Sequence, residues 1–227
     1  MPTDKPHYLG HRERLRDKLL SYGGETLADY ELLELILMMA LPRCDVKPLA
    51  KTLLNRFGSF TGVMNATPEE LMQIKGIKET TAAVIKTIPA ACERLLKQEV
   101  SNASVLNSFD KIKDYCYLKL AHKTNERFHI LFLNLKYQLI ASEEHQHGTI
   151  NHTPVYPREI LSRALALNAS AVILVHNHPS GDPKPSEADI KLTDELSKIL
   201  KISDITVYDH LIIGKSGIYS FRQNRLM

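Results

Sequence analysis

Residues 170–189 read Ser170-Ala-Val-Ile-Leu-Val-His-Asn-His-Pro-Ser-Gly-Asp-Pro-Lys-Pro-Ser-Glu-Ala-Asp189, and this stretch is the most informative in the chain. Its apolar start is typical of a buried central strand. Side chains alternate along a strand, so His176 and His178 should face one side and Asn177 the other. Prolines and a glycine then turn the chain, and a helix is expected from Ser186 to Leu200. The stretch therefore predicts a strand, a stiff loop and a helix.

The residue types in this stretch indicate a metal site. Two neutral imidazoles at His176 and His178 are suitable zinc ligands, and Asp189 in the first turn of the expected helix adds a carboxylate oxygen. Three protein ligands leave the fourth tetrahedral position open for water, which distinguishes a catalytic zinc from a structural one. We therefore predict one Zn²⁺ per chain, held by His176, His178 and Asp189.

Other interpretations of the same residues remain open. Ser186 and Asp189 have the spacing of a capping box, which would explain the aspartate without any metal. Two histidines and one carboxylate can also hold non-haem iron, although the coupled order of the ligands favours zinc. A second His-x-His pair, His145 and His147, has Arg158 where the first pair has its aspartate. We interpret that second pair as surface or sheet-edge histidines.

The motif His-x-His-Pro-Ser-Gly-Asp-Pro-x-Pro-Ser-x-x-Asp resembles the JAMM (MPN+) zinc-protease motif in the form carried by the RadC family. The resemblance covers nearly the whole chain and includes Gly10–Leu15, Asp29–Glu34, Tyr156–Ile160, Leu165–Ala169 and Asp209–Gly214. It implies an α/β/α MPN domain of cytidine-deaminase-like architecture. It also implies a peptidase or isopeptidase that uses a zinc-bound water.

The resemblance also assigns two catalytic roles. Related proteases carry a general-base glutamate at the start of an early strand, and Glu126 occupies that place ahead of an apolar run. The other candidates are Glu143 and Glu144, late in the next strand, and Glu159, in the first turn of a helix. Ser186 matches the serine that donates a hydrogen bond to the oxyanion, a role that competes with helix capping.

Composition sets broad limits. The chain has 227 residues, of which 44% are hydrophobic and 24% charged, as in ordinary globular proteins. No apolar run approaches the ~18 residues of a membrane helix, so no membrane contact is expected. Three cysteines without a Cys-x-x-Cys spacing favour a reducing, cytoplasmic location. A formal net charge of +3 is too mild to establish nucleic-acid binding.

Residues 1–100 are expected to form a small, all-α domain. Thr67-Pro68 starts a helix, and the turn around Gly76 followed by a second helix resembles a helix-hairpin-helix unit. In such units backbone N–H groups contact a DNA phosphate, so Lys75, Gly76 and Lys78 could touch DNA. A side chain at residue 78, where the motif usually has glycine, makes a protein-packing role the alternative. Pro89 should kink or shorten the second helix.

Residues 101–227 are expected to form the α/β domain, after a polar linker at 98–107. The order predicted beyond a first helix is β-β-α-β-α-β-β, which agrees with the implied mixed α/β fold. Three functions remain open: a zinc peptidase or isopeptidase, a DNA-associated protein whose metal site is structural or vestigial, and a zinc hydrolase of a non-peptide substrate. The sequence identifies no substrate.

Overall fold

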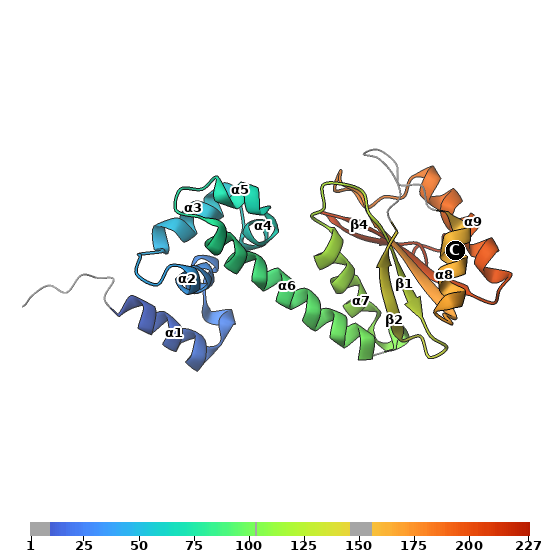
Figure 1. Ribbon diagram of the computed structural model, residues 1–227, viewed down its shortest axis with the longest axis horizontal. Coiled ribbons are helices and arrows are strands. Elements are labelled where there is room, and N and C mark those ends of the chain that lie inside the picture. The colour runs from blue at the N-terminus through green and yellow to red at the C-terminus, as the bar shows by residue number, and fades with distance from the viewer. Residues whose placement is uncertain (1–9, 103, 146–155) are drawn as a thin grey trace, which may run out of the picture. The chain divides into compact units, whose positions relative to one another are not determined.

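The computed structural model describes residues 10–102, 104–145 and 156–227 (Figure 1). The chain divides into two compact units, Met1–Cys92 and Glu93–Met227. This division falls inside helix α6 (Glu79–Asn102). The domain boundary expected at residue 100 therefore stays a prediction.

The first unit is helical, as predicted. In its described residues, the elements before α6 are α1 (His11–Tyr22), the short 3₁₀ helix η1 (Gly24–Thr26), α2 (Asp29–Ala40), α3 (Lys47–Phe57), α4 (Phe60–Asn65) and α5 (Pro68–Met72). The core is built from apolar side chains of α2 to α6, with Leu33, Leu37 and Leu53 fully buried. These residues recur at helical spacing along their elements, so each helix turns one apolar face inward.

The predicted helix, glycine turn and helix are present at α5 and α6. Thr67 caps α5: its hydroxyl accepts from Glu70 N at 3.2 Å, and the Glu70 carboxylate accepts from Thr67 N at 2.8 Å. Gly76 in the turn has a φ of +98°, a conformation that favours glycine. Ile77 is buried in the unit's core, while Lys75 and Lys78 stay exposed. The turn thus presents a glycine and two lysines to solvent.

Helix α6 passes through Pro89 without ending, so the proline does not shorten the helix, and the kink expected as the other possible outcome stays a prediction. Packing on both sides of the proline supports the helix. Ile85 is buried in the core of the first unit, and Val100 is buried in the core of the second. The polar stretch expected as a linker is largely helical, since α6 continues to Asn102 and α7 (Val105–Leu120) follows.

Replacing Pro89 by alanine should stabilise the protein. Proline inside a helix costs ~3 kcal/mol through a missing N–H donor and a clash with the preceding turn. Proline also restricts the unfolded chain, which returns up to ~1 kcal/mol. The free energy of unfolding should therefore rise by about 2 kcal/mol in urea titrations of Pro89→Ala. A lower free energy of unfolding in the variant would contradict this expectation.

The second unit contains a five-stranded mixed sheet with the order β2-β1-β3-β4-β5. Its strands are β1 (Phe128–Leu133), β2 (Leu139–Glu144), β3 (Ala171–Asn177), β4 (Thr206–Gly214) and β5 (Gly217–Ser220). The central strand β3 runs antiparallel to β1 and parallel to β4. The predicted element order is confirmed, with α8 (Pro157–Ala166) before β3 and α9 (Glu187–Lys201) after it.

Helices cover both faces of the sheet, which gives the predicted α/β/α layers (Figure 1). Helix α7 packs with Leu131, Ile173 and Leu211 on one face. Helices α8 and α9 pack with Ile130 and Leu174 on the other face. Every residue of β3 is buried, since a strand covered on both faces needs apolar side chains on both.

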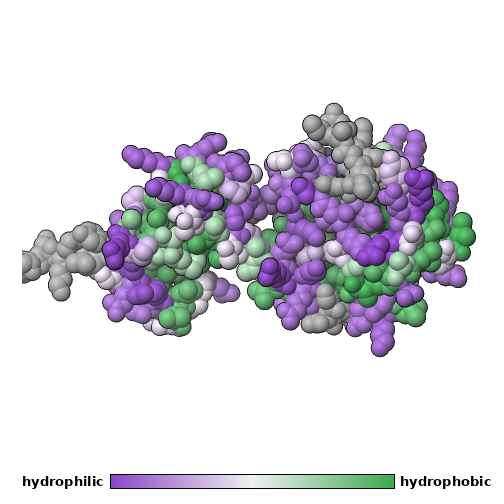
Figure 2. All heavy atoms as spheres, in the orientation of Figure 1, coloured by the Kyte–Doolittle hydropathy of each residue, from purple (hydrophilic) through white to green (hydrophobic). Residues whose placement is uncertain are grey.

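The surface of the second unit keeps some apolar side chains exposed. Leu165 of α8 and Ile190 of α9 are exposed, as is Ile202 just after α9, and Figure 2 shows apolar colouring in that region. No helix in the described ranges is long and apolar enough to span a membrane. The cytoplasmic location stays a prediction.

Candidate metal centre

Three side chains meet where β3 ends and α9 begins. His176 lies near the end of β3, His178 directly follows this strand, and Asp189 lies in the first turn of α9. The Nε2 atoms of the two histidines are 3.0 Å apart. Asp189 Oδ1 lies 3.2 Å from His176 Nε2, and Asp189 Oδ2 lies 3.4 Å from His178 Nε2. The structure therefore brings the three predicted ligands together in a group that could hold a metal ion.

A backbone carbonyl fixes the tautomer of His178. Its Nδ1 lies 2.9 Å from the carbonyl oxygen of Asp182. A carbonyl oxygen can only accept a hydrogen bond, so Nδ1 must carry the proton. In the neutral imidazole the lone pair is then on Nε2, directed toward His176 and Asp189.

A longer chain of hydrogen bonds fixes the tautomer of His176. Thr193 Oγ1 lies 2.6 Å from the carbonyl oxygen of Asp189, so the hydroxyl donates there and must accept from His210 Nδ1, also at 2.6 Å. Burial holds the pKa of His210 well below its usual value, so the ring is neutral and its Nε2 accepts. His176 Nδ1, 2.8 Å away, must donate, which leaves its Nε2 lone pair facing the site.

This donor set requires a cation. Two nitrogen lone pairs and a carboxylate converge within a few ångströms, and they repel one another unless a proton or a metal ion lies between them. Without a metal ion this cation is a proton at the imidazole nitrogens: burial alone would raise the pKa of Asp189, but hydrogen bonds shared with His176 and His178 through such a proton hold it far below its usual value. The hydrogen bond to Asp189 raises the pKa of His178. Two imidazole nitrogens and one carboxylate oxygen fit zinc.

Asp189 caps a helix and faces the histidines at the same time. Ser186 N and Ser186 Oγ both donate to Asp189 Oδ2, at 2.7 and 2.6 Å, and Asp189 N donates to Ser186 Oγ at 3.2 Å. Asp189 Oδ1 remains directed toward His176. The capping and ligand interpretations of Asp189 are therefore compatible. The oxyanion role of Ser186 stays a prediction, and its hydroxyl is used here for the cap.

The turn between β4 and β5 braces the metal-site loop. His178 N donates to the carbonyl oxygen of Ile213, and Ser216 N and Oγ donate to that of Gly181. A Cβ on Gly214 would lie 2.3 Å from the Gly181 carbonyl oxygen, so only glycine permits this approach. Asp182 is a turn residue, and its carboxylate accepts from Lys184 N.

Glu126 lies beside the site in an exposed segment just before β1. The antiparallel pairing sets Phe128 opposite His176, and continuing this register sets Glu126 opposite His178. Glu126 is also one of the charges that raise the pKa of His178. Its carboxylate is thus within electrostatic reach of His178, and its role as general base stays a prediction.

Asn177 anchors the segment that carries Glu126. This buried residue lies between the two histidines but faces the other side of the strand. Its Nδ2 donates to the carbonyl oxygens of Lys123 and Asn125, at 3.2 and 3.1 Å, and its Oδ1 accepts from Arg127 N at 2.9 Å. The strand that bears the histidines therefore also holds the backbone on both sides of Glu126.

The rival glutamates of β2 are engaged elsewhere. Glu143 forms hydrogen bonds of 2.6 to 3.0 Å with Arg163, which lower the pKa of the Glu143 carboxyl. Glu144 pairs with Arg127 at 2.8 Å and lies 3.3 Å from His129. Glu159 lies in the first turn of α8, as expected from its sequence. The ion pair with Arg163 makes Glu143 a poor proton acceptor.

Some residues that support the site could not be assigned from local patterns. The roles of Thr193 and Asn177 were not anticipated, since their partners are distant in sequence. His210 of β4 contacts His176. The carboxylate of the neighbouring Asp209 accepts instead from His210 N, Arg222 N and Ser220 Oγ. Asp209 therefore joins β4 to β5 and to the residue that follows Phe221.

The second histidine pair is only partly described. His145 directly follows the edge strand β2, and its N donates to the Phe128 carbonyl oxygen. This place agrees with a histidine at the edge of the sheet. His147 lies outside the described residues.

The second unit belongs to the class of mixed α/β domains that carry a possible metal site, formed here by two histidines at the end of the central strand and an aspartate in the first turn of the next helix. Comparison with protein families agrees with this class. Residues 106–226 match the model of the RadC-like JAB domain, and residues 7–83 match that of the UPF0758 N-terminal region. The first match covers more than half of the chain, so the chain belongs to the RadC family. The sequence motifs had indicated a resemblance to the same family.

Thr193→Val should weaken metal binding while preserving side-chain shape. The variant cannot accept from His210 Nδ1, so nothing fixes the tautomer that presents the His176 lone pair to the site. Loss of such a supporting partner typically lowers metal affinity by about 10–100-fold. The measurement is competition for Zn²⁺ against a chromophoric chelator. Thr87→Val is the matched control, because Thr87 also donates to the carbonyl four residues earlier, in the first unit. Equal zinc affinity in Thr193→Val and wild type would contradict the role of this chain of hydrogen bonds.

The stability of the metal-free protein should fall as pH rises. The folded-state pKa of His178 is raised above its ordinary value of about 6.5, so its stabilising contribution is full below that value and is lost as pH rises through the folded pKa. Urea titrations in a chelator, from about pH 6 to about pH 9, should show this loss in wild type. His178→Ala should lack it, and an identical pH profile in the two proteins would refute the expectation.

Proposed function

We propose that the chain is a zinc-dependent hydrolase of JAMM type that acts on peptide or isopeptide bonds. His176, His178 and Asp189 would hold the zinc, with Glu126 as general base and Ser186 as the oxyanion donor. A single observation carries the proposal: the Nε2 atoms of His176 and His178 lie 3.0 Å apart, and both face the Asp189 carboxylate. Membership of a JAB-domain family supports the same chemistry.

On this proposal each residue of the site would have a separate role in hydrolysis. His176, His178 and Asp189 would hold the zinc, which would supply an activated water at neutral pH and polarise the carbonyl of the substrate. Glu126, opposite His178 in the extended register, would take the proton from the attacking water and return it to the leaving nitrogen. Asn177 would keep the Glu126 segment at a fixed distance from the histidines. Ser186 would need to release Asp189 Oδ2 to donate to an oxyanion.

Metal content and hydrolysis in three matched proteins test the proposal. Wild type and Glu126→Gln should both carry nearly one zinc per chain by mass spectrometry, whereas His178→Ala should carry little. In a screen of peptide and isopeptide libraries, Glu126→Gln should lower the rate by roughly 10²–10⁴-fold, the usual contribution of general base catalysis.

Two variants sharpen this test. Asn177→Ala should keep its zinc but lose part of the rate, with faster hydrogen exchange at residues 123–127. Glu143→Gln is the matched control, since that glutamate pairs with Arg163, and it should retain full activity. Negligible zinc in all proteins would refute the metal site. Zinc without cleavage of any peptide or isopeptide, but with Glu126-dependent cleavage of another substrate, would favour the non-peptide hydrolase.

Contact with DNA is a second candidate function, and the exposed hairpin between α5 and α6 favours it. The turn at Gly76 has the left-handed conformation that lets backbone N–H groups approach a phosphate, with Lys75 and Lys78 exposed beside it. On this proposal the metal site would be structural or vestigial.

Lys78→Glu should weaken binding to duplex DNA, because phosphate contacts give salt-dependent affinity and a reversed charge removes one of them. Fluorescence anisotropy at several salt concentrations measures the effect. Lys51→Glu, on α3, is the charge-matched control. Affinity that is absent, independent of salt, or equally reduced in both variants would exclude the hairpin as the contact.

A further inference from the structure

A buried aromatic ring, that of Phe221, lies flat against the histidine that orients His176. Phe221 directly follows β5 and is fully buried. Its ring stacks on the His210 ring, with the ring centroids 4.8 Å apart and the ring planes inclined by 24°. Aromatic pairs are favourable at this separation. The two nitrogens of His210 are engaged by Thr193 and His176, so Phe221 covers a face of the ring that these hydrogen bonds leave open.

Phe128 packs against the neighbouring histidine in a similar way. Its ring stacks on that of His176 at a centroid distance of 6.0 Å, with the planes inclined by 14°, and it meets the His210 ring edge-on, also at 6.0 Å. The His176 and His210 rings are themselves 4.9 Å apart. The buried part of the hydrogen-bond chain is therefore bordered by two aromatic rings, one from β1 and one from the segment after β5.

The burial of Phe221 is not explained by the packing of a helix against the sheet. Among the described residues of the second unit, the two hydrophobic clusters between the sheet and its helices include Phe128 but not Phe221. In this part of the chain the Phe221 ring packs with the rings of His210 and Tyr219. Contact with the histidine is therefore a main reason for the position of this side chain.

The backbone holds Phe221 beside His210. Phe221 N donates to the His210 carbonyl oxygen at 3.0 Å. The residues on either side are tied to the buried carboxylate of Asp209, because Ser220 Oγ donates to Oδ2 and Arg222 N donates to Oδ1. These contacts join three consecutive residues to β4, so the Phe221 ring has little freedom to move away from His210.

A rigid neighbour of His210 matters because a neutral imidazole can carry its proton on either nitrogen. The site needs this proton on Nδ1, so that Nε2 accepts from His176. A ring that tilts, or one that water reaches, can carry the proton on Nε2 instead. His176 Nδ1 would then have to accept, and the proton of His176 would move to its own Nε2, the atom that faces the site. A closely packed apolar neighbour prevents both changes.

We propose that Phe221 is a positioning residue of the metal centre, which acts through His210 to keep the Nε2 lone pair of His176 available. The proposal rests on the zinc site of the proposed function, but it does not depend on the hydrolysis of any substrate. Phe221→Leu keeps an apolar side chain but removes the flat surface against which the His210 ring packs.

Zinc affinity and the ring protons of His210 test the proposal on the full chain. Phe221→Leu and Phe221→Met should each lower the affinity for Zn²⁺ at least about tenfold in competition with a chelator, the usual loss when support of a ligand histidine is removed. In the metal-free proteins, ¹⁵N NMR of the imidazole nitrogens should show a single tautomer of His210 in wild type and a mixture in both variants. A side chain with only a packing role would change the stability but not this tautomer.

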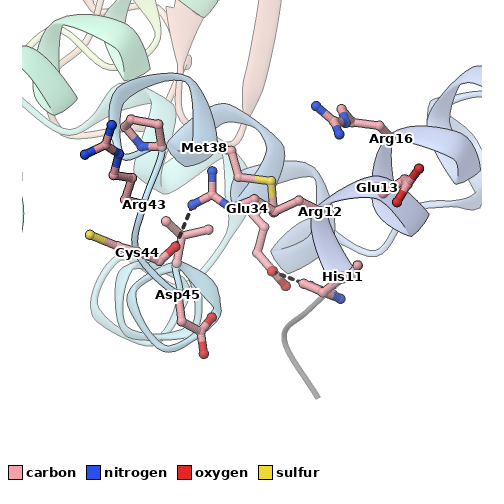
Figure 3. A pocket seen from close by; sticks show the side chains of 12 residues that line it. His11, Arg12, Glu13, Arg16, Glu34, Met38, Arg43, Cys44 and Asp45 are labelled. Carbon is pink, nitrogen blue, oxygen red and sulfur yellow. Dashed lines mark hydrogen bonds and ion pairs between the residues drawn. The ribbon is translucent and has the colours of Figure 1, made fainter. Parts of the chain in front are cut away.

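Two variants control for a general loss of stability. Phe132→Leu is the matched control, because Phe132 is also fully buried in the second unit but belongs to the hydrophobic cluster under α8 and α9. Glu34→Gln is a control in the first unit, where Oε2 of the buried Glu34 accepts from His11 Nε2 at 2.7 Å (Figure 3). Both variants should unfold more easily than wild type, yet keep its zinc affinity and its His210 tautomer.

Equal zinc affinity in Phe221→Leu, Phe132→Leu and wild type would overturn the proposal. A lower affinity in the Phe221 variants with an unchanged His210 tautomer would overturn it too, because Phe221 would then act by another route. If Phe221→Leu fails to fold, Phe221→Met, which fills more of the ring's volume, still decides the question. Negligible zinc in wild type would refute the metal site and this proposal with it. The expected loss of affinity without hydrolysis of any substrate would support this proposal while contradicting the proposed function.

Discussion

The candidate site depends on one constraint: two imidazole nitrogens with inward lone pairs lie 3.0 Å apart beside a carboxylate. This arrangement persists only because carbonyl acceptors at Asp182 and Asp189 fix the proton positions on the other side of each ring. The β3 strand, the proline-rich loop and the start of α9 serve to bring these groups together. The requirement for a cation between them follows from that geometry and does not depend on resemblance to other proteins.

The sequence predicted the parts of the second unit that rest on short-range patterns. The buried strand ending in His176 and His178, the helix start at Ser186 and the order of elements all follow from hydrophobic periodicity and turn residues. Local reasoning treated capping and metal binding by Asp189 as alternatives, because spacing alone does not show that each carboxylate oxygen has a separate direction. In the structure Oδ2 completes the cap while Oδ1 faces His176.

What could not be predicted depends on pairings between distant segments. Thr193 contacts His210 only because α9 packs against β4, and Asn177 anchors residues 123–127 only because β1 pairs with β3. The burial of Glu34 could not be predicted either, because its hydrogen-bond partner His11 is 23 residues away in the sequence. Of the two outcomes expected at Pro89, a kink or a shorter helix, the shorter helix is not observed, since tertiary packing before and after the proline outweighs the local penalty.

The parallel pairing of β4 with β3 has a consequence for how the candidate site forms during folding. The three candidate ligands lie within 14 residues of one another, so a ribosome-bound chain that has just released α9 already contains them all. The histidine that orients His176 belongs to β4 and lies 34 residues later in the chain. Until β4 pairs with β3, nothing in the described structure fixes the tautomer of His176. The ligand group would therefore reach its final geometry only after this strand is in place.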